Sequence, residues 1–180
     1  MPHFDSMTAF RDDGLLNVVV ESPRGSTMKV KFDAASGLMM LSRPLPAGLA
    51  YPFDWGFVAG TRAADGDALD AMIVWDCTSY PGLLVPARLL GVLRVEQTSR
   101  STGRRERNDR TLVVPGTAAR FGDLRSVEDV PKRTLAELEQ FFTAAVAFEG
   151  KELALLGWGD AEEAHAIVRT SARETAQRNG

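Results

Sequence analysis

The chain has 180 residues, 44% of them hydrophobic and 25% charged, with a formal net charge of -3 at pH 7. This composition indicates one globular domain over residues 1–180 and excludes a general electrostatic attraction to nucleic acid or anionic membranes. One cysteine and two histidines exclude an internal disulfide and the usual zinc sites. Cys77 follows an apolar run and is interpreted as a small core residue or an unreactive thiol. No apolar run approaches about 18 residues, so we expect a cytoplasmic protein.

The first two-thirds of the chain predicts short strands separated by turns. Residues 27–33 alternate, with Lys29 and Lys31 on the face opposite the apolar side chains. Glycine and proline occupy the gaps between strands, as is typical of small antiparallel barrels. Other apolar or β-branched runs lie at residues 15–21, 37–42, 71–75, 84–97 (interrupted by Pro86 and Gly91) and 110–115.

The last third changes to helical periodicity. Thr134 and Glu137 have the spacing of a capping box and predict a helix over residues 134–148. Asp160 and Glu163 predict a similar start for a second helix, which ends near Gly180. We therefore expect a small β-barrel followed by two C-terminal α-helices.

Asp65, Asp67 and Asp70 crowd a turn that opens into an apolar run. Asp-Gly sequences favour turns, so Asp65 and Asp67 are accounted for as turn residues without any ligand. Asp70 enters an apolar strand, where a carboxylate is costly unless it is paired, hydrogen-bonded or metal-bound. Three neighbouring carboxylates also repel one another unless cations separate them, and Mg²⁺ prefers such oxygen ligands. The spacing does not match an EF-hand, and the turn and metal interpretations both remain open.

Basic residues elsewhere favour a site for anions. Lys29 and Lys31 belong to the alternating run, and Arg43 follows in residues 41–45. Carboxylates for cations beside Lys and Arg for anionic oxygens are the groups that metal-assisted phosphoryl transfer uses. A solvated strand face is the alternative for the two lysines.

The order of these motifs resembles the soluble inorganic pyrophosphatases of the small-barrel type (family I). The segment "DGDALD" is close to the family's aspartate signature, with Ala68 in place of its usual proline. The resemblance implies a mainly β fold, a five-stranded OB-type barrel with helices. It covers nearly the whole chain in order, through "NVVVESPRGSTMKVKFD", "SRPL", "YPFDWGFVAGTRAADGDALDAMIV", "PGLLVPARLLGVL", "LVVP", "LEQFF" and "GWGDAEEAHAIV".

The resemblance also implies an activity, Mg²⁺-dependent hydrolysis of pyrophosphate to phosphate by a metal-activated water. By match of motif, Asp65 and Asp70 are metal ligands and Asp67 is the base near the attacking water. Lys29 and Arg43 would hold phosphate oxygens. Because family members assemble, we expect a homo-oligomer. Supporting positions fall on Glu21, Tyr51 and Arg110.

Part of the family's site is replaced in this sequence. Lys31 stands where the family has a glutamate, and Trp55 stands where it has a tyrosine. Gln97 and Asn108 replace two metal-binding aspartates, although Asp109 or Glu106 could substitute for Asn108 in space. These changes predict weaker cation and phosphate binding. Two further replacements, of a tyrosine and a lysine for the distal phosphate, are Ala145 and Val146.

Two interpretations therefore remain. The first is a hydrolase, weak or retuned to another phosphoanhydride. The second is a catalytically degenerate relative that binds metal, a phosphorylated ligand or a protein partner. Arginines in residues 100–110 could neutralise phosphate or form a solvated loop. That loop has no aromatic residue for stacking, so we expect no nucleic acid and no membrane as partners.

Overall fold

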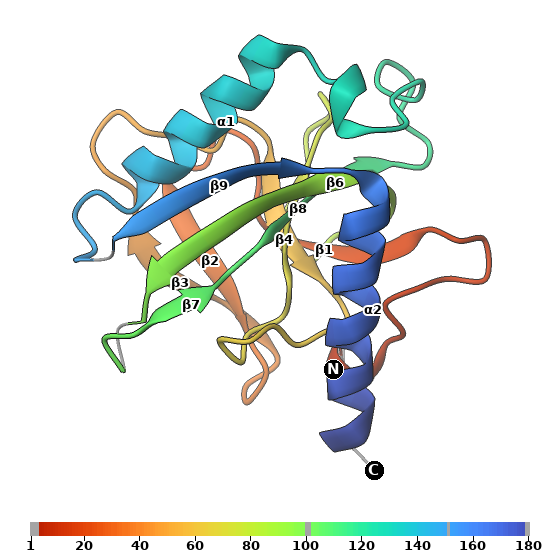
Figure 1. Ribbon diagram of the computed structural model, residues 1–180, viewed down its shortest axis with the longest axis horizontal. Coiled ribbons are helices and arrows are strands. Elements are labelled where there is room, and N and C mark those ends of the chain that lie inside the picture. The colour runs from red at the N-terminus through yellow and green to blue at the C-terminus, as the bar shows by residue number, and fades with distance from the viewer. Residues whose placement is uncertain (1–3, 100–101, 151, 179–180) are drawn as a thin grey trace.

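The centre of the molecule is a five-stranded β-barrel (Figure 1), seen in a computed structural model that describes residues 4–99, 102–150 and 152–178. β1 pairs with β4, β4 with β5, β5 with β8, β8 with β6, and β6 with β1, so the pairings form a closed ring. Only the β5–β8 pairing within this ring is parallel. The predicted mainly β fold is thus confirmed. The ring consists of β1 (Leu16–Ser22), β4 (Asp54–Val58), β5 (Asp70–Ile73), β6 (Leu84–Thr98) and β8 (Arg110–Pro115).

Further short elements surround the ring. β2 (Met28–Asp33) and β3 (Leu38–Pro44) form a separate antiparallel hairpin. β7 (Arg105–Arg107) and β9 (Leu153–Gly159) both pair with β6, and Figure 1 shows β9 running beside β6 along its length. Two single-turn 3-10 helices, η1 (Phe4–Ser6) and η2 (Val127–Asp129), complete the connections. The long β6 therefore joins the ring to the strands outside it.

Three strands, β4, β7 and β9, were not predicted. All five residues of β4 are buried, so its sequence lacks the alternation that marks a half-exposed strand. Gly56 lies where a Cβ would meet the Val19 carbonyl oxygen at 1.9 Å, so this glycine permits close packing of β4 on β1. β6, in contrast, continues through Pro86 and Gly91, with a register irregularity between Leu89 and Gly91.

Both C-terminal helices are present, and one start differs from the prediction. α1 (Lys132–Ala145) begins after Pro131 without a side-chain cap, so the predicted capping box at Thr134 is wrong. Thr134 instead lies within the first turn. α2 (Ala161–Arg178) begins as predicted, because the Glu163 amide donates to Asp160 Oδ1 at 2.8 Å. The predicted end near Gly180 lies outside the described residues. In the described part of the chain, no helix is long and apolar enough to cross a membrane.

The helices cover two different apolar surfaces of the barrel. Met72 and Val74 of the β5 region pack in a cluster that includes Phe142 of α1. Ala71 and Ile73 pack in a second cluster that includes residues of α2. Residues of this segment therefore alternate between two buried surfaces, as in a strand that is covered on both faces. Cys77 lies beyond the strand and is exposed, so its interpretation as a core residue is wrong.

Candidate functional site

Two cross-strand pairs bring the predicted site residues together. Lys29 of β2 lies opposite Arg43 of β3 in the hairpin. Asp70, the first residue of β5, lies beside Arg110, the first residue of β8. Because both pairs are fixed by backbone register, their positions follow from the sheet rather than from flexible loops.

Asp70 is the acidic centre of this arrangement. Burial raises the pKa of its carboxyl group, while the nearby charges of Lys29, Arg110 and Lys31 act in the opposite direction. Burial also lowers the pKa of Lys29, and Asp70 is the largest influence opposing that change. Burial likewise lowers the pKa of Arg110, and Asp70 is again the largest influence opposing that change. These groups therefore form one electrostatic unit, in which each charge offsets the desolvation of another.

Asp65 and Asp67 lie in a tight turn between β4 and β5. The Asp67 amide donates to Asp65 Oδ1 at 3.1 Å, and Gly66 has a φ of 89°, so the predicted turn is confirmed. The turn also places the carboxylates close together. Burial raises the pKa of Asp65, and the charges of Asp70, Asp67 and Glu106 raise it further. A cation near Asp65 would relieve this unfavourable charge.

A lysine contacts the same turn from the hairpin. Lys31 Nζ lies 2.5 Å from Asp67 Oδ2, and the two side chains are 41% and 62% exposed. Burial by itself would lower the pKa of Lys31, but the hydrogen bond and charge of Asp67, with Asp70, raise it. Asp67 is therefore already paired with a cation that belongs to the chain.

Glu21 of β1 is a buried acid next to these residues, and it is 6% exposed. Its Oε1 accepts a hydrogen bond from the Phe32 amide at 2.8 Å. Burial, assisted by the charge of Asp70, raises the pKa of Glu21 from 4.5 to about 7. Glu21 therefore connects β1 to β2 and titrates near neutral pH, consistent with a supporting position.

A small recess of about 30 Å³ lies beside Asp70's cations. Arg110 forms part of its wall, with its guanidinium 4.3 Å from the Phe142 ring centre and 5.5 Å from that of Trp55. Lys29 Nζ lies 5.7 Å from the Trp55 ring centre. Among the described residues, Trp55 Nε1 and Arg110 Nε are buried without hydrogen-bond partners. Unpaired buried donors are costly, and an anionic oxygen would satisfy them.

The opposite wall of the recess is less suited to an anion. Arg43 lines it, but its guanidinium donates to the Ala145 carbonyl at 2.8 Å and pairs with Glu149 at 3.3 Å. Ala145 and Val146 contribute no charged groups. Tyr51 is buried against Trp55, and burial raises the pKa of its hydroxyl. The predicted roles of Arg43 and Tyr51 remain predictions, with Arg43 already partly occupied.

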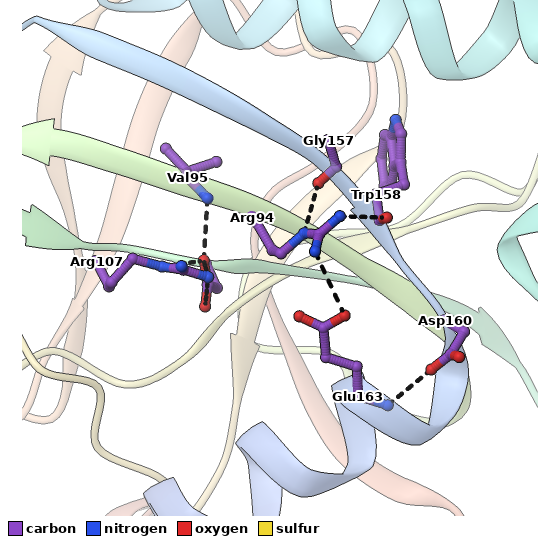
Figure 2. A network of polar contacts seen from close by, with 8 residues as sticks. Arg94, Val95, Arg107, Gly157, Trp158, Asp160 and Glu163 are labelled. Carbon is purple, nitrogen blue, oxygen red and sulfur yellow. Dashed lines mark hydrogen bonds and ion pairs between the residues drawn. The ribbon is translucent and has the colours of Figure 1, made fainter.

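The two proposed substitutes for Asn108 differ in their surroundings. Both oxygens of Asp109 accept hydrogen bonds from Arg107, and Oδ1 also accepts from the Val95 amide (Figure 2). Asp109 is thus occupied by its own chain. Glu106, in contrast, is close enough to raise the pKa of Asp65. Of the two, Glu106 is the carboxylate whose charge acts on Asp65.

A second network in Figure 2 holds the outer strands to α2. Arg94 of β6 donates to the Gly157 and Trp158 carbonyls of β9 and lies 4.0 Å from Glu163 of α2. These bonds join backbone and helix rather than forming a recess with unpaired donors. The network therefore holds β6 to β9 and to α2, and its role is structural.

The arginine-rich segment contributes one residue to the recess. Arg105 pairs with Glu96 at 3.3 Å, and Arg107 pairs with Asp109, so neither supplies a free guanidinium to phosphate. Arg110 alone among the segment's described residues lines the recess. Arg100 lies outside the described residues. Arg104 is exposed and does not line the recess. Phosphate neutralisation by this loop stays a prediction, with Arg110 as the arginine placed at the recess.

Two features of the site were missed by sequence reasoning. The contact of Lys31 with Asp67 joins residues 36 positions apart, and no local pattern reports it. Phe142, which stacks on Arg110, reads in the sequence only as a core residue of a helix. The alternation of β2 did place Lys31 on the same side as Lys29, which was the available signal.

The sequence profile of the inorganic pyrophosphatase family matches residues 18–176. The inorganic pyrophosphatase of Synechocystis sp. is 34% identical over 155 residues, covering 86% of this chain and 88% of the relative. That of Nostoc sp. is 34% identical over 158 residues, covering 88% and 90%. The crystal structure of the Thermus thermophilus inorganic pyrophosphatase superposes with a TM-score of 0.87 at 29% identity, covering 97% of this chain and 99% of that one.

The closed small barrel and the facing carboxylates and cations already define a protein built to hold charged ligands. The chain belongs to the inorganic pyrophosphatase family. Members of this family are hydrolases and depend in general on metal ions.

The donor set fits a divalent cation in part. Asp65 and Asp70 offer the oxygen ligands that hard cations prefer, and their raised pKa values show that cationic charge would stabilise them. However, among the residues the structure describes, no three Asp, Glu, His or Cys side chains are arranged to hold a metal ion. Gln97 and Asn108 offer amides instead of carboxylates. Amide oxygens are weaker ligands for hard cations than carboxylates, so these two positions fit such a cation less well.

Proposed function

We propose that this protein hydrolyses inorganic pyrophosphate to two phosphates with Mg²⁺, at a site centred on Asp67 and Asp70. The observation that carries the proposal is the convergence of Lys29 and Arg110 on Asp70, next to a recess where Trp55 Nε1 and Arg110 Nε are buried without hydrogen-bond partners among the described residues. The oxygens of a phosphate group can pair with the two cationic side chains and can accept hydrogen bonds from the two buried N–H groups. The family relationship supports pyrophosphate as the phosphate compound.

The proposed chemistry assigns a task to each side chain. Lys29 and Arg110 hold oxygens of one phosphate, and Asp67 accepts a proton from the attacking water. The water oxygen bonds to phosphorus, the bridging P–O bond breaks, and the bridging oxygen leaves with the second phosphate. Asp65 and Asp70, with Glu106 nearby, would hold a divalent cation, which would supply Lewis acidity and charge neutralisation when bound.

Phosphate release tests this proposal. We expect wild-type protein to release phosphate from pyrophosphate with Mg²⁺, and Asp67→Asn to be about 10²-fold slower or worse, because the proton acceptor is lost. Asp123→Asn is the matched control, since Asp123 is exposed and outside the site. Equal rates for wild type and Asp67→Asn would refute the assignment.

A second candidate function is ligand binding without turnover. It is favoured by the pairing of Arg43 with Glu149 and by the apolar Ala145 and Val146, which together leave one side of the recess without free charge. Pyrophosphate binding measured by calorimetry, with no phosphate released at high protein concentration, would establish this function. Robust turnover would exclude it. A phosphoanhydride other than pyrophosphate is the natural alternative substrate in the same assay.

We also propose a cytoplasmic homo-oligomer with no nucleic-acid or membrane partner. Support for assembly comes from apolar side chains left exposed on the β2–β3 hairpin: Met28, Leu38, Met40 and Leu41 are 47% to 64% exposed. Light scattering should give a mass that is a multiple of 19.6 kDa. A monomer mass at micromolar concentration would contradict assembly.

A further inference from the structure

The loop of residues 65–70, called the Asp65–Asp70 loop below, faces cations that belong to the chain itself. Lys31 Nζ contacts Asp67 Oδ2 at 2.5 Å, and the backbone of β2 holds Lys31 two residues beyond Lys29 on the same side of the strand. Arg110 enters the group from the other direction, through its register with Asp70. Lys29, Lys31 and Arg110 thus approach Asp70 from two separate strands. Of these three cations, Lys31 also pairs with Asp67.

These cations compensate most of the acidic charge. The interacting carboxylates are Glu21, Asp65, Asp67, Asp70 and Glu106, and the interacting cations are Lys29, Lys31 and Arg110. With all five carboxylates ionised, two negative charges are left without a counterpart, and with Glu21 protonated one is left. Five ionised carboxylates without such cations would need about two or three divalent ions to reach neutrality. The demand for metal ions is therefore lower here than the acidic residues alone suggest.

Lys31 is the cation best placed to stand in for a metal ion. Its partner Asp67 is the carboxylate assigned as proton acceptor, and both side chains reach solvent, where a hydrated ion would otherwise approach. An exposed ion pair adds little to folding stability, so this pair is not needed to hold the fold together. Its contribution is charge at the loop.

We propose that the Lys31 ammonium occupies the place of one divalent cation at the Asp65–Asp70 loop, so that the protein binds fewer Mg²⁺ ions. This inference rests on the proposed function, because it assumes that the same loop binds Mg²⁺. An ammonium neutralises a carboxylate and orients it but has no empty orbital for a water molecule. The built-in cation therefore replaces the electrostatic role of a metal ion and not its Lewis acidity.

Mg²⁺ titration calorimetry on the full chain, without pyrophosphate, tests the inference. The variants are Lys31→Met, which removes the charge, and Lys31→Glu, which reverses it. A unit charge about 5 Å from a divalent ion in water changes its affinity roughly tenfold. We therefore expect Lys31→Met to bind Mg²⁺ about tenfold more tightly, and Lys31→Glu to bind still more tightly or to take up an additional ion. Lys132→Met and Lys132→Glu are the matched controls, because Lys132 is exposed at the start of α1.

The outcomes separate this inference from the proposed function. Tighter or additional Mg²⁺ binding in the Lys31 variants, with the Lys132 variants unchanged, supports the stand-in role. Unchanged affinity and stoichiometry in Lys31→Glu, or equal changes in both sets, overturns it, as does an absence of Mg²⁺ binding in every variant. Phosphate release by the wild-type preparation reports the proposed function independently. Circular dichroism of each variant confirms that it is folded.

Discussion

Replacing Arg110 with methionine should destabilise the protein substantially. Arg110 is 7% exposed, stacks on Phe142 and lies beside Asp70. Methionine keeps most of the apolar stem, but it removes the charge and the planar group. A desolvated cation–π contact contributes about 2 kcal/mol, and leaving the Asp70 carboxylate without one of its compensating charges costs about 1–3 kcal/mol. Because Lys29 still faces Asp70, part of the second cost is offset. We expect a loss of about 2–4 kcal/mol in the free energy of unfolding.

A double-mutant cycle in urea, at neutral pH with chelator present, measures the contribution of charge. Asp70→Asn removes a carboxylate whose pKa burial has raised, so on its own it should cost less than Arg110→Met. The double variant should be more stable than the sum of single effects predicts, by about 1–3 kcal/mol. Arg110→Lys is the control that keeps the charge and loses the fork and the stack, and its cost should be smaller than that of Arg110→Met.

Additive effects would refute this reasoning. If the double variant equals the sum of the singles within about 0.5 kcal/mol, the two charges do not interact across β5 and β8. A cost for Arg110→Lys as large as that for Arg110→Met would show that Arg110 stabilises the protein through its stacking on Phe142 and not through its charge beside Asp70.

Two further predictions concern buried acids. The raised pKa of Glu21 means that the folded state keeps a proton from pH 4.5 to about 7 while the unfolded chain loses it, so stability should fall by up to about 3 kcal/mol as pH rises through that range. Urea unfolding should show a smaller decline in Glu21→Gln, where Asp65 and Asp70 still contribute theirs, and the full decline in the exposed control Glu128→Gln; a full decline in Glu21→Gln would contradict the cause. Trp75→Phe removes the 2.6 Å bond to the fully buried Asp54 and should cost about 1–3 kcal/mol. Trp158→Phe removes the 2.7 Å hydrogen bond that Trp158 Nε1 donates to the half-buried Glu139, and it should lower the free energy of unfolding less. An equal loss in the two variants would argue against burial as the reason.

The parts of the fold that could be predicted are those where a local pattern has one physical cause. Residues 27–33 alternate because Val30 and Phe32 on one face are covered while the other face carries charge, and β2 formed as expected, although Met28 on the apolar face is exposed. β4 is buried on both faces and has no such alternation. At the start of α1, Thr134 matched a capping pattern, but the backbone at Pro131 was already suited to begin a helix.

The site divides in the same way. The cost of a carboxylate at Asp70 followed from its place in an apolar strand, and its burial confirms that expectation. The partners that offset the cost could not be found locally, because Lys31 and Arg110 come from different strands. Which of Asp109 and Glu106 stays available also depended on a pairing with Arg107, which only the three-dimensional arrangement determines.

The parallel pairing of β5 with β8 has a consequence for how the chain folds. β8 lies forty residues after β5 in the sequence, beyond the whole of β6, so its pairing with β5 requires this intervening chain to be closed into a loop. Arg110 is the first residue of β8 and pairs with Asp70, the first residue of β5. The strand that covers Asp70 is therefore also the strand that carries its cation, so the docking of β8 couples the burial of this acid to the arrival of the Arg110 guanidinium.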